Sequence, residues 1–189
     1  MIQDCLKKIF LSVFTVLQFS FLAAQEITKE GAGTLKLGMS FQQFKVIYPK
    51  SSIKRESGEE GIIRLIASIQ NAKGQITAKV YFDDSNKIDG ITFLGDNYRI
   101  KGVPIGVSFG ELKNKGHITS IFYTIDGDEA GVSVMLDKSY YPHISIRETK
   151  SLKLQLSKLI GLANNSGEIP INKMPLNAKI ESVWIATPN

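Results

Sequence analysis

A nine-residue motif occurs twice in the chain, and the two copies lie 68 residues apart. The first copy covers residues 37–45 (LGMSFQQFK), and the second covers residues 105–113 (IGVSFGELK). Gly, Ser, Phe and Lys are identical in both copies, and aliphatic or Met side chains fill matching positions. Because an internal repeat specifies the same local structure twice, it limits the possible folds strongly. The motif predicts two related units, residues 25–101 and residues 102–189.

Each copy of the motif is typical of a helix start. Ser40 can cap the N–H groups of the first helical turn, and Gln43, three residues later, can reach back to the backbone of the cap. Ser108 and Glu111 repeat this capping box. Gly38 and Gly106, two residues before the cap serines, permit a turn with positive φ. We therefore expect one helix after Ser40 and another after Ser108.

After each expected helix, the side-chain pattern changes to that of β-strands. The first unit contains three such segments, at residues 62–69, 76–82 and 88–94. The second unit contains a predicted hairpin and one further strand, at residues 118–125, 132–136 and 143–147. Each unit is thus a helix followed by an antiparallel meander. The predicted fold class is α+β, with the helices packed on one face of antiparallel sheet.

The last forty residues are expected to form a helix, a loop and a strand. Residues 149–163 contain good helix formers with leucines on one face, although three of those leucines also alternate as in a strand. Residues 169–175 hold two prolines and are expected to be a loop. Residues 178–186 are expected to return to the sheet as a strand. Trp184, the only tryptophan, is expected in the core because this strand has no clean polar face.

Residues 1–24 have the pattern of a secretory signal peptide. Two lysines precede an apolar run over residues 9–22, and two alanines follow it. The run would span about 21 Å as a helix, which is less than the roughly 30 Å hydrocarbon core of a bilayer. We expect cleavage after Ala24 and an exported protein, periplasmic or secreted, without a membrane span. An uncleaved anchor is the alternative, because Leu22 stands where a small residue is preferred.

Cysteine content and charge exclude several classes of function. Cys5 is the only cysteine and lies inside the expected signal peptide. The exported chain therefore has no disulfide, thiolate metal site or cysteine nucleophile. The formal net charge is only +5, and the modest basic cluster at residues 147–158 lacks interleaved aromatic residues. A solvated helix face is the preferred interpretation of that cluster, and no nucleic-acid partner is expected.

Catalytic and metal-binding patterns are also missing. His117 and His143 are the only histidines, and neither has a carboxylate beside it at helical spacing, so no compact zinc site is indicated. Residues 106–110 (GVSFG) match the pattern G-x-S-x-G, but Ser108 is expected to cap a helix there, and the chain contains no glycine loop for phosphate. Acidic residues at 83–86 and 126–129 could offer oxygens to calcium, but they lack EF-hand spacing and occupy predicted turns. No metal and no cofactor is expected.

Aromatic side chains gather around Pro142. Tyr140, Tyr141 and His143 lie together there, and amphipathic rings are enriched at the centres of binding interfaces. These three residues are therefore the candidate partner-binding residues. The expected partner is another envelope or secreted protein.

The helix-start motif resembles that of two groups of exported bacterial proteins. LGMSFQQF is similar to the G-M-(S/T)-x-x-(E/Q)-aliphatic start of the small outer-membrane-assembly lipoproteins of the SmpA/OmlA type, and of each tandem half of the β-lactamase inhibitory protein. The resemblance implies helical pairs on antiparallel sheets without enzymatic activity. The chain departs from both groups, since it has neither a lipid-attachment cysteine nor the cysteines of the inhibitor. It also looks like uncharacterised exported proteins of Gram-negative bacteria.

The preferred hypothesis is a non-catalytic exported module for binding or envelope interaction. One alternative is a secreted hydrolase whose site is assembled across the repeat interface. That alternative requires a polar cleft that brings His117 or His143 to a serine and a carboxylate. Another alternative is an inhibitor of a secreted enzyme, which an exposed aromatic patch on the sheet would favour.

Overall fold

The structure is a computed structural model that describes residues 24–57, 63–115, 118–126, 129–136, 142–146 and 167–187. These residues form mostly β-sheet, together with two short α-helices, α2 (Phe41–Ile47) and α3 (Phe109–Lys115), and a short 3-10 helix at Ile171–Lys173. Among them no helix is long and apolar enough to cross a membrane. The expected helix at 149–163, the basic cluster and His117, Tyr140 and Tyr141 lie outside the described residues.

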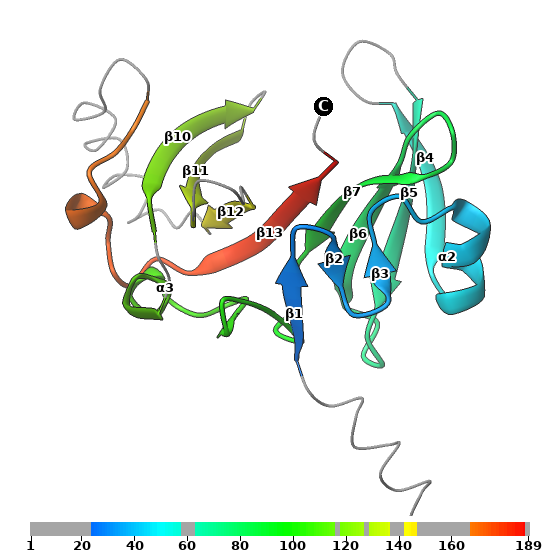
Figure 1. Cartoon of the computed structure of the whole chain (residues 1–189), viewed down its shortest axis with the longest axis horizontal. Coiled ribbons are helices and arrows are strands. Elements are labelled where there is room, and N and C mark those ends of the chain that lie inside the picture. Colours follow the sequence, from blue (N-terminus) through cyan, green and yellow to red (C-terminus); the bar gives the residue numbers. More distant parts are fainter. Residues whose placement is uncertain are drawn as a thin grey trace, which may run out of the picture.

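Six antiparallel strands form the main sheet, in the order β12-β13-β7-β6-β5-β4 (Figure 1). Their bounds are β4 (Ser52–Ser57), β5 (Ile63–Gln70), β6 (Ile76–Phe82), β7 (Ile88–Phe93), β12 (His143–Ile146) and β13 (Ile180–Ala186). For every strand except β4, both ends lie within two residues of the ends that the sequence predicts. The last strand returns to the sheet as expected, where it pairs Val183 with Phe93 and Ile144 with Val183.

The predicted hairpin of the second unit is confirmed as β10 (Ser120–Asp126) and β11 (Glu129–Met135). Figure 1 shows it beside β12. At this junction the Oγ atom of Ser133 lies 3.5 Å from Nδ1 of His143. The hairpin therefore forms a two-stranded sheet of its own, next to the β12 edge of the main sheet.

A second, smaller sheet has the order β3-β2-β1-β8-β9. Its strands are β1 (Gln25–Thr28), β2 (Gly31–Ala32), β3 (Leu35–Lys36), β8 (Tyr98–Ile100) and β9 (Val103–Pro104). None of these strands was predicted. The β2–β3 hairpin requires glycine at position 31, where φ is +143° and a Cβ atom would collide with the carbonyl oxygen of Leu35.

Both helices begin as the motif predicts. The Oγ atom of Ser40 accepts from the N–H of Gln43 at 3.3 Å, and Oε1 of Gln43 accepts from the N–H of Ser40 at 3.0 Å. In the second copy, Ser108 Oγ accepts from the N–H of Glu111 at 3.3 Å, and Glu111 Oε2 accepts in return at 3.2 Å. The two capping boxes are confirmed.

The surroundings of the two motif copies also match. A hairpin precedes each helix, with the pairs Ala32↔Leu35 and Ile100↔Val103 in equivalent places. Each motif then binds a strand of the main sheet through the glycine before the cap. Gly38 N–H donates to the Ile88 carbonyl oxygen of β7 at 2.7 Å, and Gly106 N–H donates to the Ile180 carbonyl oxygen of β13 at 3.0 Å. Both glycines have positive φ, +77° and +97°.

Removing either cap hydroxyl is expected to destabilise the protein. Ser40→Ala and Ser108→Ala should each lower the free energy of unfolding by about 0.5–2 kcal/mol, because one N–H of the first turn, that of Gln43 or Glu111, loses its acceptor. Urea denaturation measures this change, with Ser52→Ala on an exposed strand as the control. Midpoints that match the control for both variants would mean that the caps contribute nothing to stability.

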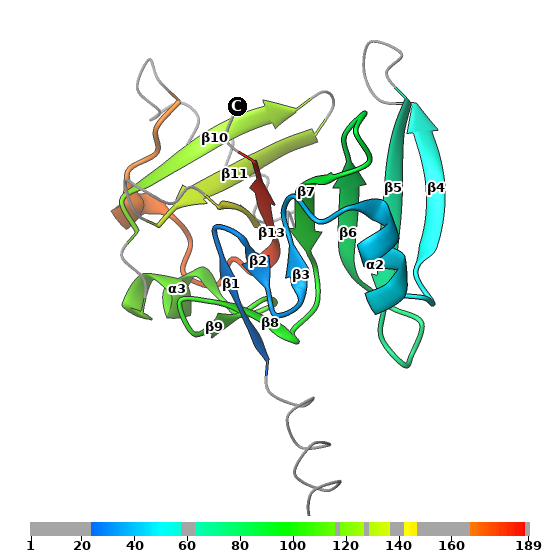
Figure 2. The same ribbon diagram turned by 45° about the vertical axis from the view of Figure 1, so that its right-hand side comes forward.

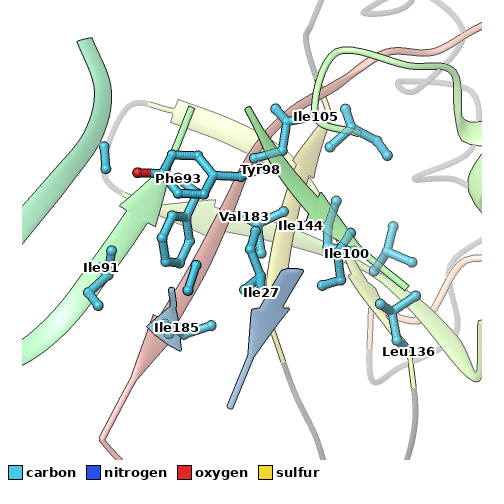
Figure 3. Close-up of a cluster of buried hydrophobic side chains, with 14 of the residues drawn as sticks. Ile27, Ile91, Phe93, Tyr98, Ile100, Ile105, Leu136, Ile144, Val183 and Ile185 are labelled. Carbon is cyan, nitrogen blue, oxygen red and sulfur yellow. The ribbon is translucent and has the colours of Figure 1, made fainter. Parts of the chain in front are cut away.

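The core lies between one face of the main sheet and the small sheet, and Phe44 of α2 contacts Phe82 of the main sheet. Figure 2 shows α2 in front of β5 and β6, and β1 to β3 in front of β7 and β13. Side chains from both sheets meet there, as Figure 3 shows for Ile27, Phe93, Tyr98 and Val183, which are all buried. Since side chains alternate along a strand, every second residue of these strands points to the opposite side. That opposite side of the main sheet is called the open face below.

Candidate interaction surface

One row of side chains crosses the open face. The strand register pairs His143 with Trp184, Trp184 with Thr92, and Thr92 with Lys79. Directly paired residues of antiparallel strands share a face of the sheet, so these four side chains lie side by side. Trp184 is 37% exposed. The prediction that Trp184 fills the core is therefore wrong.

The position of β13 explains the exposure of Trp184. The flanking residues Val183 and Ile185 are buried in the core, and alternation directs Trp184 to the other face. The strand shows no clean polar face because the apolar Trp184 alternates with the buried Val183 and Ile185, and Ser182, which is also on the open face, is only 8% exposed. Strands on both sides cover a small side chain at this central position, whereas the large indole extends beyond them.

The indole of Trp184 lies directly over the backbone of Gly90. A Cβ atom at Gly90 would lie 3.4 Å from Nε1 of Trp184 and 3.6 Å from Cδ2 of Tyr81. Gly90 does not have a positive φ, so the backbone conformation does not require glycine there. Because glycine has no side chain, it leaves space for two aromatic rings close to the backbone. Tyr81 pairs directly with Gly90 across β6 and β7.

His143 completes the aromatic group. The ring centroids of His143 and Trp184 are 5.2 Å apart, with the ring planes inclined by 51°. Partial burial lowers the pKa of His143 below its ordinary value. The side chains of Trp184, Tyr81 and His143, above Gly90, are called the aromatic patch.

Among the described residues, the surroundings of His143 do not resemble a catalytic triad. Its polar contact there is the hydroxyl of Ser133 at 3.5 Å, and burial is the cause of its pKa shift. A catalytic histidine normally has a carboxylate that orients it. Of the three predicted binding residues, His143 therefore joins the aromatic patch, while Tyr140 and Tyr141 lie outside the described residues.

A carboxylate stands next to the patch. Strand β6 pairs Tyr81 with Gly90 but Phe82 with Ile88, so Asp89 is the extra residue of a β-bulge. Both Ile88 and Ile91 are buried in the core. The two residues between them, Asp89 and Gly90, consequently turn toward the open face. Within the described residues, Oδ1 of Asp89 is buried without a hydrogen-bond partner.

Charges around Asp89 act on its ionisation. Burial raises the pKa of Asp89, and the guanidinium of Arg64 opposes this increase. Asp83 and Asp84 add to it through repulsion. Asp89 thus lies among charges of both signs, and Arg64 affects its pKa more than either aspartate does.

The acidic residues at 83–86 form the turn that the sequence predicts. Oδ1 of Asp83 accepts from the N–H of Lys87 at 2.8 Å, and Asn86 has a positive φ of 57°. In the parts of the chain that the structure describes, no group of three or more His, Cys, Asp or Glu residues could hold a metal ion.

Comparison with known proteins yields one structural likeness. The chain matches no family model and no curated protein. The crystal structure of the uncharacterized protein yfeY from Escherichia coli is similar, with a TM-score of 0.54 and 12% sequence identity, over 88% of this chain and 99% of that chain. At this identity the likeness concerns the fold alone.

Proposed function

We propose that the chain is a non-catalytic module that binds another envelope or secreted protein through the aromatic patch. The observation that carries this proposal is the exposed indole of Trp184, held over Gly90 and beside His143. Large aromatic side chains dominate the centres of protein interfaces, because they bury much surface at a low cost in conformational entropy. An indole that fills no space in the core, yet lies over Gly90 and beside the ring of His143, fits this role.

The proposal includes export and a two-unit architecture. Residues 1–24 would be removed as a signal peptide, and the remaining chain would act in the periplasm or outside the cell. The first strand begins at Gln25, directly after the expected cleavage site, which agrees with this view. Residues 25–101 and 102–189 would be related units whose helices pack on one face of antiparallel sheet. The matching caps and glycine hydrogen bonds support that relation.

Inhibition of a secreted enzyme is a second candidate. An aromatic patch on a sheet face also suits an inhibitor, and the two roles differ only in what the bound partner does. The activity of the captured partner distinguishes the two roles, because an inhibitor must lower the activity of the enzyme that it binds.

Affinity capture from envelope extracts, with the protein as bait, tests the proposal. The wild-type protein is compared with a variant that carries a charge on the open face. Thr92→Glu inserts a carboxylate beside Trp184 and should abolish recovery of the partner, since the carboxylate, although it lies opposite Lys79, would have to lose its water at the interface. Ser52→Glu is the matched control. Ser52 lies on the same face and in the same register row as Thr92, but on the edge strand β4, three strands away from β7. Equal recovery by both variants, or no specific partner for the wild-type protein, would contradict the proposal.

A further inference from the structure

We propose that two copies of this chain pair through strand β4, antiparallel to each other, so that the main sheet continues from one copy into the other. This inference is independent of the partner that the aromatic patch binds. It assigns an interface to an edge of the sheet that the proposed function leaves unused.

The first argument is the open edge of the main sheet. Strand β4 is the last strand on its side and has β5 as its neighbour, and Figure 2 shows it along the outer side of the sheet. In the part of the chain that the structure describes, no backbone hydrogen bond joins residues 52–57 to any segment except β5. The backbone N–H and C=O groups on the outer side of such a strand can pair with a further strand.

The second argument is that the second unit covers the equivalent edge with its own chain. Strand β10 follows α3 as β4 follows α2. The side of β10 that faces away from β11 is occupied, because Glu168 forms a bridge with Phe122 and the N–H of Ile169 donates to the carbonyl oxygen of Ile121 at 2.8 Å. The first unit has no such segment at β4. A strand of another molecule therefore fits there.

The third argument is the charge pattern of β4, which favours a second copy as that molecule. A twofold axis normal to the sheet keeps the open faces of both copies on the same side, so residues of one face stand opposite each other. With this axis at Arg55, Lys54 of each copy stands opposite Glu56 of the other. An axis at Lys54 or at Glu56 would instead place like charges opposite each other.

The charged side chains of β4 are accessible for this pairing. Lys54 and Glu56 form an ion pair within the strand, and their side chains are still 56% and 45% exposed. Opposite charges directly across two strands stabilise a sheet, and like charges destabilise it. Arg55 meets its own copy at the axis, on the other face, so one like-charge pair opposes two pairs of opposite charge.

The fourth argument is an exposed isoleucine beside the edge. Ile63 is 65% exposed and pairs with Ser57 at the end of β4. In the pairing about Arg55, Ser57 stands opposite Ile53 of the second copy. Since serine is small, the two isoleucines can approach each other over it. The pairing would thus remove apolar surface from water at two symmetric places.

Sedimentation velocity of the purified protein over a range of concentrations tests the pairing. The wild-type protein should form dimers. Lys54→Glu or Glu56→Lys should each raise the dissociation constant about tenfold or more, because like charges then stand opposite each other. Lys115→Glu, on the exposed last turn of α3, is the matched control and should leave the dissociation constant within a factor of about two.

A mixture of the two single variants tests the register. In a mixed pair the introduced glutamates stand opposite the introduced lysines, so equimolar Lys54→Glu and Glu56→Lys should form a heterodimer with nearly the wild-type affinity. A wild-type protein that stays monomeric, single variants that dimerise as well as the wild type, or folded single variants whose mixture stays monomeric would each overturn the proposal.

The double variant Lys54→Glu/Glu56→Lys keeps the test decisive if a single variant fails to fold. It retains opposite charges within the strand and across the axis, so it should dimerise with itself. It should not pair with the wild-type protein, because like charges would then meet twice. Free exchange between this variant and the wild-type protein would contradict pairing through β4.

Discussion

Phe44→Ala is expected to lower the free energy of unfolding by about 3–5 kcal/mol, which is the usual cost of deleting a fully buried phenyl ring. Phe44 is the buried residue of α2. Its ring stacks on Tyr48 with centroids 5.2 Å apart and meets Phe82 of the main sheet edge-on at 5.5 Å. Since a domain of this size is typically stable by about 5–15 kcal/mol, much of the stability should be lost.

Val46→Ala is the matched control for this substitution. Val46 lies on the same helix and is 81% exposed, so its truncation should change stability by no more than about 0.5 kcal/mol. Its counterpart directly after the second motif copy is Asn114, 68 residues later, which also indicates that the helix does not need an apolar side chain there. Guanidinium denaturation midpoints compare the two variants. Equal midpoints would contradict the packing of α2 against β6.

Features that depend on neighbouring residues could be predicted from the sequence. The capping boxes at Ser40 and Ser108 involve side chains and N–H groups only three residues apart, so the motif contains all the information needed. Strands β6 and β7 follow from alternating side chains and from the turn residues between them. The same holds for the β10–β11 hairpin.

Strands without such a local pattern were missed. Strands β2, β3 and β9 have two residues each, which is too short for any periodicity. Strand β4, with the sequence SIKRES, is an edge strand whose residues are exposed except for the partly buried Ile53. It therefore lacks the buried side chains that mark a strand, and its pairing with β5 holds it in the sheet.

The candidate site depends on pairings between distant parts of the chain. Trp184 faces Thr92 and His143 through strand contacts that no local pattern encodes. One signal was available, because Gly90 interrupts the apolar segment at residues 88–94 and an isolated glycine in a strand marks a bulge or a close approach. Gly90 has both features, a bulge beside it and an indole above it. The glycine alone could not identify Trp184 as the ring that covers it.

Trp184→Ala is expected to weaken binding of the captured partner by about 2 kcal/mol or more, which is roughly thirtyfold, as truncation of a central interface tryptophan usually does. The stability of the free protein should change less than in Phe44→Ala, because a third of the indole surface is already in water. Isothermal titration calorimetry measures the dissociation constant, and denaturation of the same sample measures stability.

Leu176→Ala serves as the control for this effect. Leu176 is a large apolar residue, 56% exposed, and lies outside the aromatic patch near the start of α3. Its truncation should leave the dissociation constant within a factor of about two, as for surface substitutions away from an interface. A similar loss of affinity in both variants would mean that general surface hydrophobicity drives binding, and that Trp184 has no special part in it.

Site-specific photocrosslinking tests most directly whether the open face is the interaction surface. In one variant a benzophenone amino acid replaces Thr92, which lies between Trp184 and Lys79 on the open face. In the other it replaces Val46 of α2, and this helix packs on the opposite face of the main sheet. If the open face binds the partner, irradiation of intact cells yields a covalent adduct with the same protein that capture recovers, and it does so from position 92. An adduct from position 46, with none from position 92, would contradict this assignment.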